Sequence, residues 1–320
     1  MSMPETVGVD LGGTKILVGV VGEDRKVLYE DQEQVAGQGQ DELLATLERE
    51  VREALEARPD VAAVGLGIPC TIDRERGVAI SAVNLPIHNV PIRDRMRERL
   101  GIPVFVDNDA NVAALAEHRF GAAKGTTDAV MLTIGTGIGG GVIIDGEVYR
   151  GATGAASEPG HMVIDFDGPP CQGNCPNHGC LETFASGTAL GREGREAAEA
   201  NPESALGSVL AEGGVIDGKA VTDAANDGDP VAVAVVEEAG RRLGAGLSGL
   251  ANIFEPEVIV IGGGVTKVIG ELMVAPAREE LRARALPPMN KTPVRMAELG
   301  TEAGMVGAAE MARLELEQGG

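Results

Sequence analysis

Aromatic side chains are nearly absent from this 320-residue sequence, which has no tryptophan, two tyrosines and five phenylalanines. Positive charge is also scarce, because 27 lysines and arginines stand against 49 aspartates and glutamates, leaving a net charge of −22. Proteins that bind single-stranded nucleic acid stack bases on aromatic rings and attract the phosphates with basic grooves. The composition therefore predicts that nucleic acid is not a partner.

Long apolar runs are missing as well. No stretch approaches the roughly 18 consecutive apolar residues of a membrane-spanning helix. The N-terminus shows no charged segment followed by an apolar one, as a secretory signal would. The sequence therefore predicts a cytoplasmic protein with no membrane partner.

Cysteine occurs only four times, and three of the four crowd into ten residues, at Cys171, Cys175 and Cys180. In a chain expected to be cytoplasmic, such clustering favours a metal site over a disulfide. Cys70 stands alone and is typical of a small core residue.

Glycine, by contrast, is abundant, with 46 residues, and much of it falls in a repeated pattern. Residues 6–30 and 128–151 both read as short β-branched strands joined by glycine and polar turns. Each half also contains a strand ending in glycines, at 61–70 and 256–265. The repeat predicts an α/β fold of two duplicated halves, with ligands bound in the cleft between them.

The expected domain division follows from this repeat. The final helix, at about 303–317, is expected to cross back onto the first half. A smaller N-terminal α/β domain then comprises residues 1–118 and 303–320. The larger C-terminal domain comprises residues 119–302 and carries the cysteine loop.

Three glycine turns end apolar strands, in DLGGTK (10–15), GTGIGGG (135–141) and IGGGV (261–265). Glycine permits close backbone approach, and free N–H groups there can hold phosphate oxygens. The first turn alone is equally compatible with an ordinary hairpin, and the second leads into a strand, which disfavours a dinucleotide Rossmann site. Their repetition favours a nucleotide site, with Asp10 holding Mg²⁺ through water. The candidate contacts are Asp10, Gly12, Gly13, Thr14, Lys15, Thr136, Gly137, Gly262 and Gly263.

Two carboxylates, Asp107 and Asp109, flank Asn108 where an apolar strand meets an alanine-rich helix, in VFVDNDANVAALAE (104–117). Carboxylates are common at such junctions because they accept hydrogen bonds from free N–H groups. A carboxylate placed against a hydroxyl can also act as a general base. The local pattern leaves both interpretations of Asp109 open, whereas Asp107 is expected to cap or brace the loop.

These motifs together resemble the actin-like sugar kinase superfamily, and within it the ROK family of repressors, open reading frames and sugar kinases. GVDLGGTK, LTIGTGIGGG and VIVIGGGV resemble its two phosphate motifs and its adenosine motif, and VDNDAN its catalytic loop. EPGHMVID (158–165) resembles its ExGH motif, and CQGNCPNHGCLE (171–182) its cysteine motif. The resemblance covers nearly the whole chain and is greatest to bacterial glucokinases. It implies two actin-like (ribonuclease H-like) domains around a cleft, with ATP and Mg²⁺ as cofactors.

The resemblance also implies roles for individual residues. Asp109 would be the general base for the 6-hydroxyl of a hexose. The other residues expected to bind sugar hydroxyls are Asn84, Asn108, Glu158, His161 and Glu182. Glu158 and Glu182 are also compatible with ordinary loop and surface carboxylates, and Asn84 with a turn asparagine before Leu-Pro.

A structural Zn²⁺ is implied too, with His161, Cys171, Cys175 and Cys180 as its ligands. The spacing C-x3-C-x4-C departs from the family's usual C-x-C-G-x-x-G-C-x-E. Counted back from Cys180, Cys175 keeps its family position, but Cys171 is displaced by two residues. His178 is therefore an alternative to Cys171.

The resemblance, together with these residues, implies ATP-dependent phosphorylation of glucose at its 6-hydroxyl, giving glucose 6-phosphate. Kinases for fructose, allose or N-acetylmannosamine, and a glucokinase that uses polyphosphate, are alternatives. A sugar-responsive repressor is not expected, because the family's repressors place a DNA-binding segment ahead of this fold, and the first strand here begins by about residue 6. Since family members are commonly dimers or tetramers, a homodimer or homotetramer is expected.

Overall fold

The computed structural model describes residues 4–82, 85–173 and 175–319. It divides into two compact units. The first comprises Met1–Gly125, Gly141–Ser157 and Thr301–Gly320, and the second comprises Thr126–Gly140 and Glu158–Gly300. Among the described residues, no helix combines the length and the apolar character needed to cross a lipid bilayer.

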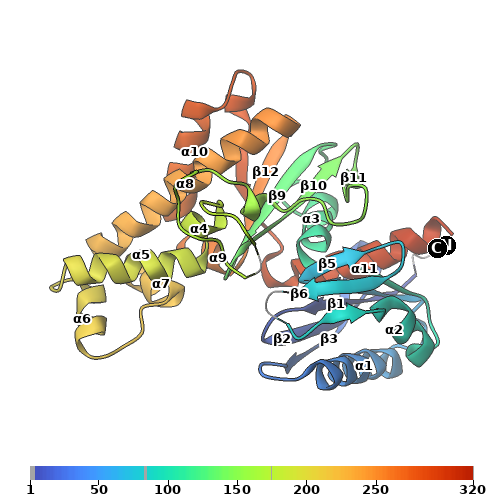
Figure 1. The fold of residues 1–320 in the computed structure, drawn as a ribbon. Helices are drawn as coiled ribbons and strands as arrows, with labels where there is room; N and C mark the ends of the chain where they lie inside the picture. The colour runs from blue at the N-terminus through green and yellow to red at the C-terminus, as the bar shows by residue number, and fades with distance from the viewer. Residues whose placement is uncertain (1–3, 83–84, 174, 320) are drawn as a thin grey trace. The chain divides into compact units, whose positions relative to one another are not determined.

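The first unit is built on a five-stranded sheet in the order β3-β2-β1-β4-β8 (Figure 1). Strands β1, β2 and β3 form an antiparallel meander, whereas β4 and β8 continue the sheet in parallel with β1. Helices α1 and α11 cover opposite faces of this sheet (Figure 1). The bounds of the sheet strands and their helices are β1 Thr6–Leu11, β2 Lys15–Val21, β3 Val27–Gln34, β4 Ala63–Ile68, β8 Val104–Asn108, α1 Gln40–Ala57, α2 Ile92–Leu100, α3 Asp109–Phe120 and α11 Ala303–Glu317. A smaller sheet of β5 Cys70–Asp73, β6 Val78–Ala82 and β7 His88–Val90 and the short helix η1 Glu23–Arg25 complete this part.

Paired glycines explain how α11 reaches the sheet. Gly8 of β1 lies opposite Gly65 of β4. A Cβ on Gly8 would come within 1.9 Å of the Met305 carbonyl oxygen, and one on Gly65 within 1.8 Å of the Ala308 carbonyl oxygen. The helix backbone therefore lies directly on the strands, which only glycine permits at this distance.

The second sheet has the order β11-β10-β9-β12-β13. Its β9–β10–β11 meander is followed by the parallel strands β12 and β13, as in the first sheet. Its strands are β9 Ala129–Ile134, β10 Ile138–Ile144, β11 Glu147–Val148, β12 Val258–Gly262 and β13 Val294–Met296. The helices are α4 Glu182–Ala185, α5 Gly187–Ala200, α6 Ala205–Ala211, α7 Gly218–Asn226, α8 Pro230–Phe254, α9 Gly264–Ile269 and α10 Glu271–Arg284, with short turns η2 Pro159–His161, η3 Met289–Lys291 and η4 Gly300–Glu302. In Figure 1, α8 and α10 lie side by side.

The two equivalent sheets confirm the predicted duplicated α/β fold, since the meanders expected at 6–30 and 128–151 are β1–β3 and β9–β11. The two units differ from the division expected at 118/119 and 302/303, chiefly because 141–157 groups with the first unit. Gly141 explains this grouping. A Cβ there would come within 2.5 Å of the Ala114 Cβ and 3.0 Å of the Ala110 carbonyl oxygen, so the end of β10 packs directly on α3.

Candidate functional site

The junction of β8 and α3 carries the polar group Asp107, Asn108 and Asp109. Asn108 is the N-cap of α3, because its Oδ1 accepts hydrogen bonds from the N–H groups of Ala110 at 2.9 Å and Asn111 at 3.3 Å. Its Nδ2 donates to the carbonyl oxygen of Cys70 at 3.4 Å. The N-cap of α3 is therefore Asn108 and not Asp109.

Asp109 is the first residue of α3 and is half-buried. Burial raises its pKa from 3.8 to about 6, although hydrogen bonds from backbone N–H groups oppose the shift. Burial and the nearby charge of Asp109 also raise the pKa of Asp10 to about 7, and Lys15 opposes that shift. The first unit therefore holds two interacting carboxylates that titrate near neutral pH.

Asp107 is buried. Its Oδ1 accepts from the backbone N–H of Asn108 at 2.8 Å and from Asn111 Nδ2 at 3.0 Å. Its Oδ2 accepts from Arg150 Nε at 2.6 Å. Asp107 thus braces the loop, and its partner Arg150 lies 43 residues away, so no local pattern indicates the pairing.

The turn between β1 and β2 is a tight hairpin. The Gly12 N–H donates to the Lys15 carbonyl oxygen at 2.8 Å, and the residues Gly13 and Thr14 are exposed. Lys15 Nζ donates to Gln32 Oε1 at 2.9 Å on the neighbouring strand. The turn has the geometry of an ordinary hairpin, and its exposed residues are accessible to an anion.

The second unit contains a cluster of His161, Cys171, Cys175 and Cys180, whose ligand atoms all lie within 4.8 Å of one another. Cys171 Sγ is 3.5 Å from His161 Nδ1, and Cys175 Sγ is 3.9 Å from Cys180 Sγ. A tetrahedral zinc with Zn–S of about 2.3 Å and Zn–N of about 2.0–2.1 Å would separate its ligand atoms by about 3.6–3.8 Å. The donor set and its spacing therefore fit a structural zinc ion.

Cys171 reaches this cluster despite its displaced sequence position. Its backbone N–H donates to the Asn177 carbonyl oxygen at 2.9 Å, which folds the loop back toward Cys180. His178 is exposed, and in the part of the chain that the structure describes it lies outside the cluster. The geometry favours Cys171 over His178 as the fourth ligand.

Glu182, the first residue of α4, is buried beside this cluster. Its Oε2 accepts from the Ile138 N–H at 3.2 Å, and its Oε1 lies 3.7 Å from His161 Nδ1. Glu158 precedes the short helix η2 and is exposed. The structure thus brings His161 and Glu182 together. The remaining expected sugar contact, Asn84, lies outside the described residues.

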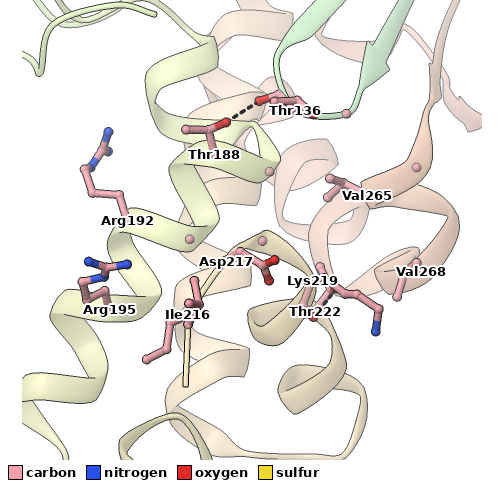
Figure 2. Close-up of a pocket in the computed structure, with 16 residues that line it drawn as sticks. Thr136, Thr188, Arg192, Arg195, Ile216, Asp217, Lys219, Thr222, Val265 and Val268 are labelled. Atoms are coloured by element: carbon pink, nitrogen blue, oxygen red, sulfur yellow. Dashed lines mark hydrogen bonds between the residues drawn. The ribbon is translucent and has the colours of Figure 1, made fainter. Parts of the chain in front are cut away.

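A cavity of about 950 Å³ opens in the second unit (Figure 2). Four segments form its wall: the β9–β10 turn, α5, residues 215–222 at the start of α7, and α9. Thr188 Oγ1 donates to the Thr136 carbonyl oxygen at 2.9 Å, which ties α5 to the turn (Figure 2). The lining residues are Gly135, Thr136, Gly187, Thr188, Gly191, Arg192, Arg195, Val215, Ile216, Asp217, Gly218, Lys219, Thr222, Gly264, Val265 and Val268.

Only Thr136 among the expected nucleotide contacts lines this cavity, although Gly263 directly precedes Gly264 of its wall. Gly263 has φ of +99°, and a Cβ there would meet the Ile134 backbone within 2.4 Å, so glycine is required at the end of β12. A Cβ on Gly137 would come within 2.6 Å of Glu182 Oε2. The contributions of α5 and α7 were not predicted, because residues 188–250 show only a helical pattern.

Comparisons with known proteins agree over nearly the whole chain. The model of the ROK family matches residues 6–315. A glucokinase of Streptomyces coelicolor is 39% identical over 316 residues, covering 96% of this chain and 97% of its own. A glucokinase of Thermotoga maritima is 37% identical over 308 residues, covering 95% and 96%. The crystal structure of a ROK family glucokinase from Streptomyces griseus in complex with glucose and AMPPNP is 40% identical, with a TM-score of 0.85 and coverage of 97% of this chain and 99% of that one.

Proposed function

The chain belongs to the ROK family, and we propose that it phosphorylates glucose at the 6-hydroxyl with ATP, giving glucose 6-phosphate and ADP. The observation that carries this proposal is Asp109, a half-buried carboxylate whose pKa is raised to about 6 and which is not used as a helix cap. A general base works best when its pKa lies near the working pH. The similarity to glucokinases over 96% of the chain supports glucose as the acceptor.

Phosphoryl transfer by this site follows from the residues of the chain. Asp109 accepts the proton of the 6-hydroxyl while the sugar oxygen forms a bond to the γ-phosphorus. The bond from that phosphorus to the β–γ bridging oxygen breaks, and ADP leaves with the electron pair. Because the Oδ1 of Asn108 caps α3, its contribution to a sugar hydroxyl is the second N–H of Nδ2.

Glu158, His161 and Glu182 are proposed to hold other hydroxyls of the ring, with Asn84 as a further contact. Support comes from Glu182, which is buried and is oriented by the Ile138 N–H. His161 turns Nδ1 toward Cys171, which leaves Nε2 for a hydroxyl. Buried polar groups that pair with specific hydroxyls reject sugars that lack them.

The cavity of the second unit is proposed to bind the adenosine of ATP. Its volume of about 950 Å³ suits a nucleoside, and its glycine and valine wall suits a flat base. The exposed turn of Gly12, Gly13, Thr14 and Lys15 would hold phosphate oxygens, together with Thr136 and Gly137, and Gly262 and Gly263 would support the adenosine side. Contacts by backbone N–H groups need no bulky side chain, which accounts for the glycine content of these turns.

Mg²⁺ would be held through water by Asp10. The raised pKa of Asp10 fits this role, because a half-buried carboxylate beside Asp109 is costly to ionise and a cation would offset that cost. When bound, Mg²⁺ neutralises charge on the transferring phosphate. Lys15 adds a fixed positive charge to the same region.

A structural Zn²⁺ held by His161, Cys171, Cys175 and Cys180 is the second proposed cofactor. Support comes from the ligand-atom distances of 3.5 and 3.9 Å within the cluster. Burial raises the pKa of the Cys171 and Cys180 thiols, a cost that a bound cation offsets by stabilising the thiolates. Zinc at this place would fix the ring of His161 for sugar binding.

Steady-state kinetics test the proposal. With ATP and Mg²⁺, kcat/KM should be higher for glucose than for N-acetylmannosamine, N-acetylglucosamine, mannose or fructose, and discrimination can reach about 10⁴-fold where a hydroxyl contact is lost. If one of these sugars were a better substrate, glucose would be the wrong acceptor but the kinase assignment would stand. If no sugar were phosphorylated, both assignments would be wrong. Polyphosphate in place of ATP tests the donor. Sedimentation analysis tests the proposed homodimer or homotetramer.

A further inference from the structure

A buried ion pair lies behind the proposed base. Asp107 is 1% exposed. Its carboxylate accepts hydrogen bonds from the following turn and from Arg150 of a distant segment. Arg150 Nε donates to Oδ2 at 2.6 Å, and Arg150 Nη1 donates to the Val148 carbonyl oxygen at 3.2 Å. Arg150 is thus fixed to its own segment and to the strand that ends at the proposed active-site turn.

The other oxygen of the same carboxylate, Oδ1, is hydrogen-bonded to the turn itself. Asp107 Oδ1 accepts from the N–H of Asn108 and from the Nδ2 of Asn111 in the first turn of α3. Asp109 and Ala110 lie between these two contacts. One carboxylate therefore holds the backbone of Asn108 before the proposed base and the side chain of Asn111 after it.

A second arginine makes the pair part of a larger network. Arg74, which follows β5, places Nε 3.9 Å from Asp107 Oδ2 and forms an ion pair with Glu315 of α11. Burial and the neighbouring Arg150 lower the pKa of Arg74, and Asp107 opposes this shift. The shorter contact, from Arg150, is the stronger restraint on Asp107.

We propose that Asp107 and Arg150 act as a positioning pair that holds Asn108 and Asp109 in the geometry needed for phosphoryl transfer, a role that rests on the proposed function. Neither residue is assigned a contact with sugar or nucleotide. Their effect is on the base, and a misplacement of about 1 Å at a reacting group can cost about 10²-fold in rate.

The test uses the full-length protein in four variants: Asp107→Asn, Arg150→Gln, the double variant that combines them, and the control Arg76→Gln. Arg76 is a matched control because it is 77% exposed and its contact with Asp73 is 4.0 Å long. kcat and KM for glucose and ATP are measured for each variant, with circular dichroism and thermal unfolding as checks of folding. The double variant replaces the ion pair by two neutral amides, so it remains informative if Arg150→Gln alone does not fold.

Each single variant should lower kcat by about 10–100-fold and change either KM by less than about threefold. The double variant should lose no more than the worse single variant, because both changes break one interaction. Arg76→Gln should match the wild type.

The positioning role would be overturned by a folded single or double variant with kcat within about threefold of wild type. Losses that multiply in the double variant would also overturn it. A loss seen mainly as a raised KM would do so as well. Failure of the proposed function is distinguishable, because it appears as a wild type that phosphorylates no sugar, whereas failure of the pair appears as active variants beside an active wild type.

Discussion

Asp109→Asn should slow phosphoryl transfer and at the same time stabilise the fold. Asparagine keeps the shape of aspartate but accepts no proton, and loss of a general base typically costs about 10²–10⁴-fold in kcat. The helix cap is untouched, because Asn108 makes the capping bonds. A variant that is slower yet more stable is expected of a buried base and not of a cap.

The stability change follows from the pKa of Asp109, which is raised from 3.8 to about 6. A raised pKa means that the folded protein disfavours the ionised carboxylate. Ionisation therefore lowers the free energy of unfolding at a pH above the folded pKa and has no effect at a pH below the unfolded pKa. A shift of about two units corresponds to about 3 kcal/mol at most, and screening by solvent at a half-buried site reduces this to about 1–2 kcal/mol. The variant should gain that amount at pH 7, and the gain should vanish near the unfolded pKa of 3.8.

Thermal or urea unfolding at pH 7 and pH 4, beside steady-state kinetics, measures both effects. In the wild type, kcat/KM should fall about tenfold from pH 7 to pH 5, since ionised Asp109 falls from about 0.9 to about 0.1 of the molecules. The residual activity of Asp109→Asn should lack this decline. The reasoning is refuted if the variant keeps more than about a tenth of wild-type turnover, or if it loses about 1 kcal/mol of stability as a helix cap would.

Three further changes test other parts of the structure. The purified protein should contain about one zinc per chain by elemental analysis. Cys175→Ala and Cys180→Ala should lower both the zinc content and the thermal stability, whereas the control His178→Ala should change neither. Full zinc content in the cysteine variants would contradict the proposed ligands. Gly65→Ala should lower the free energy of unfolding by about 1–3 kcal/mol, because its Cβ would meet the backbone of α11 at 1.8 Å. Gly39→Ala is the control in urea unfolding, because its Cβ would have open space around it. Gly264→Leu should raise KM for ATP by about tenfold or more, because Gly264 lines the cavity and a Cβ there would point into open space. Glucose binding, measured by calorimetry, should be unchanged. An unchanged KM for ATP would mean that the adenosine binds elsewhere.

Much of the fold was predictable because it is specified by neighbouring residues. The alternation of β-branched residues and glycine turns indicated β1–β3 and β9–β11, and the repeat of that pattern indicated two equivalent sheets. The grouping of 141–157 with the first unit was not predicted. It depends on the packing of Gly141 against α3, a contact that no pattern along the chain records.

The proposed site divides in the same way. Motifs identified Asp109, His161 and the three clustered cysteines, because the residues of each motif lie close together in the chain. The cavity wall from α5 and α7 carried no such signal, since its glycines and threonines are spaced like those of any helix (Figure 2). Such a wall exists only after distant helices pack.

The sequence by itself determined the strands, the turns, the family resemblance and the set of candidate ligands, since these depend on residue type and on short spacings. Tertiary structure alone decided three points. It placed Cys171 and not His178 beside His161, it raised the pKa of Asp109 by burying it, and it paired Asp107 with Arg150. Burial and contacts between distant segments arise only when the chain has folded, because each depends on which surfaces exclude water and which side chains then face one another.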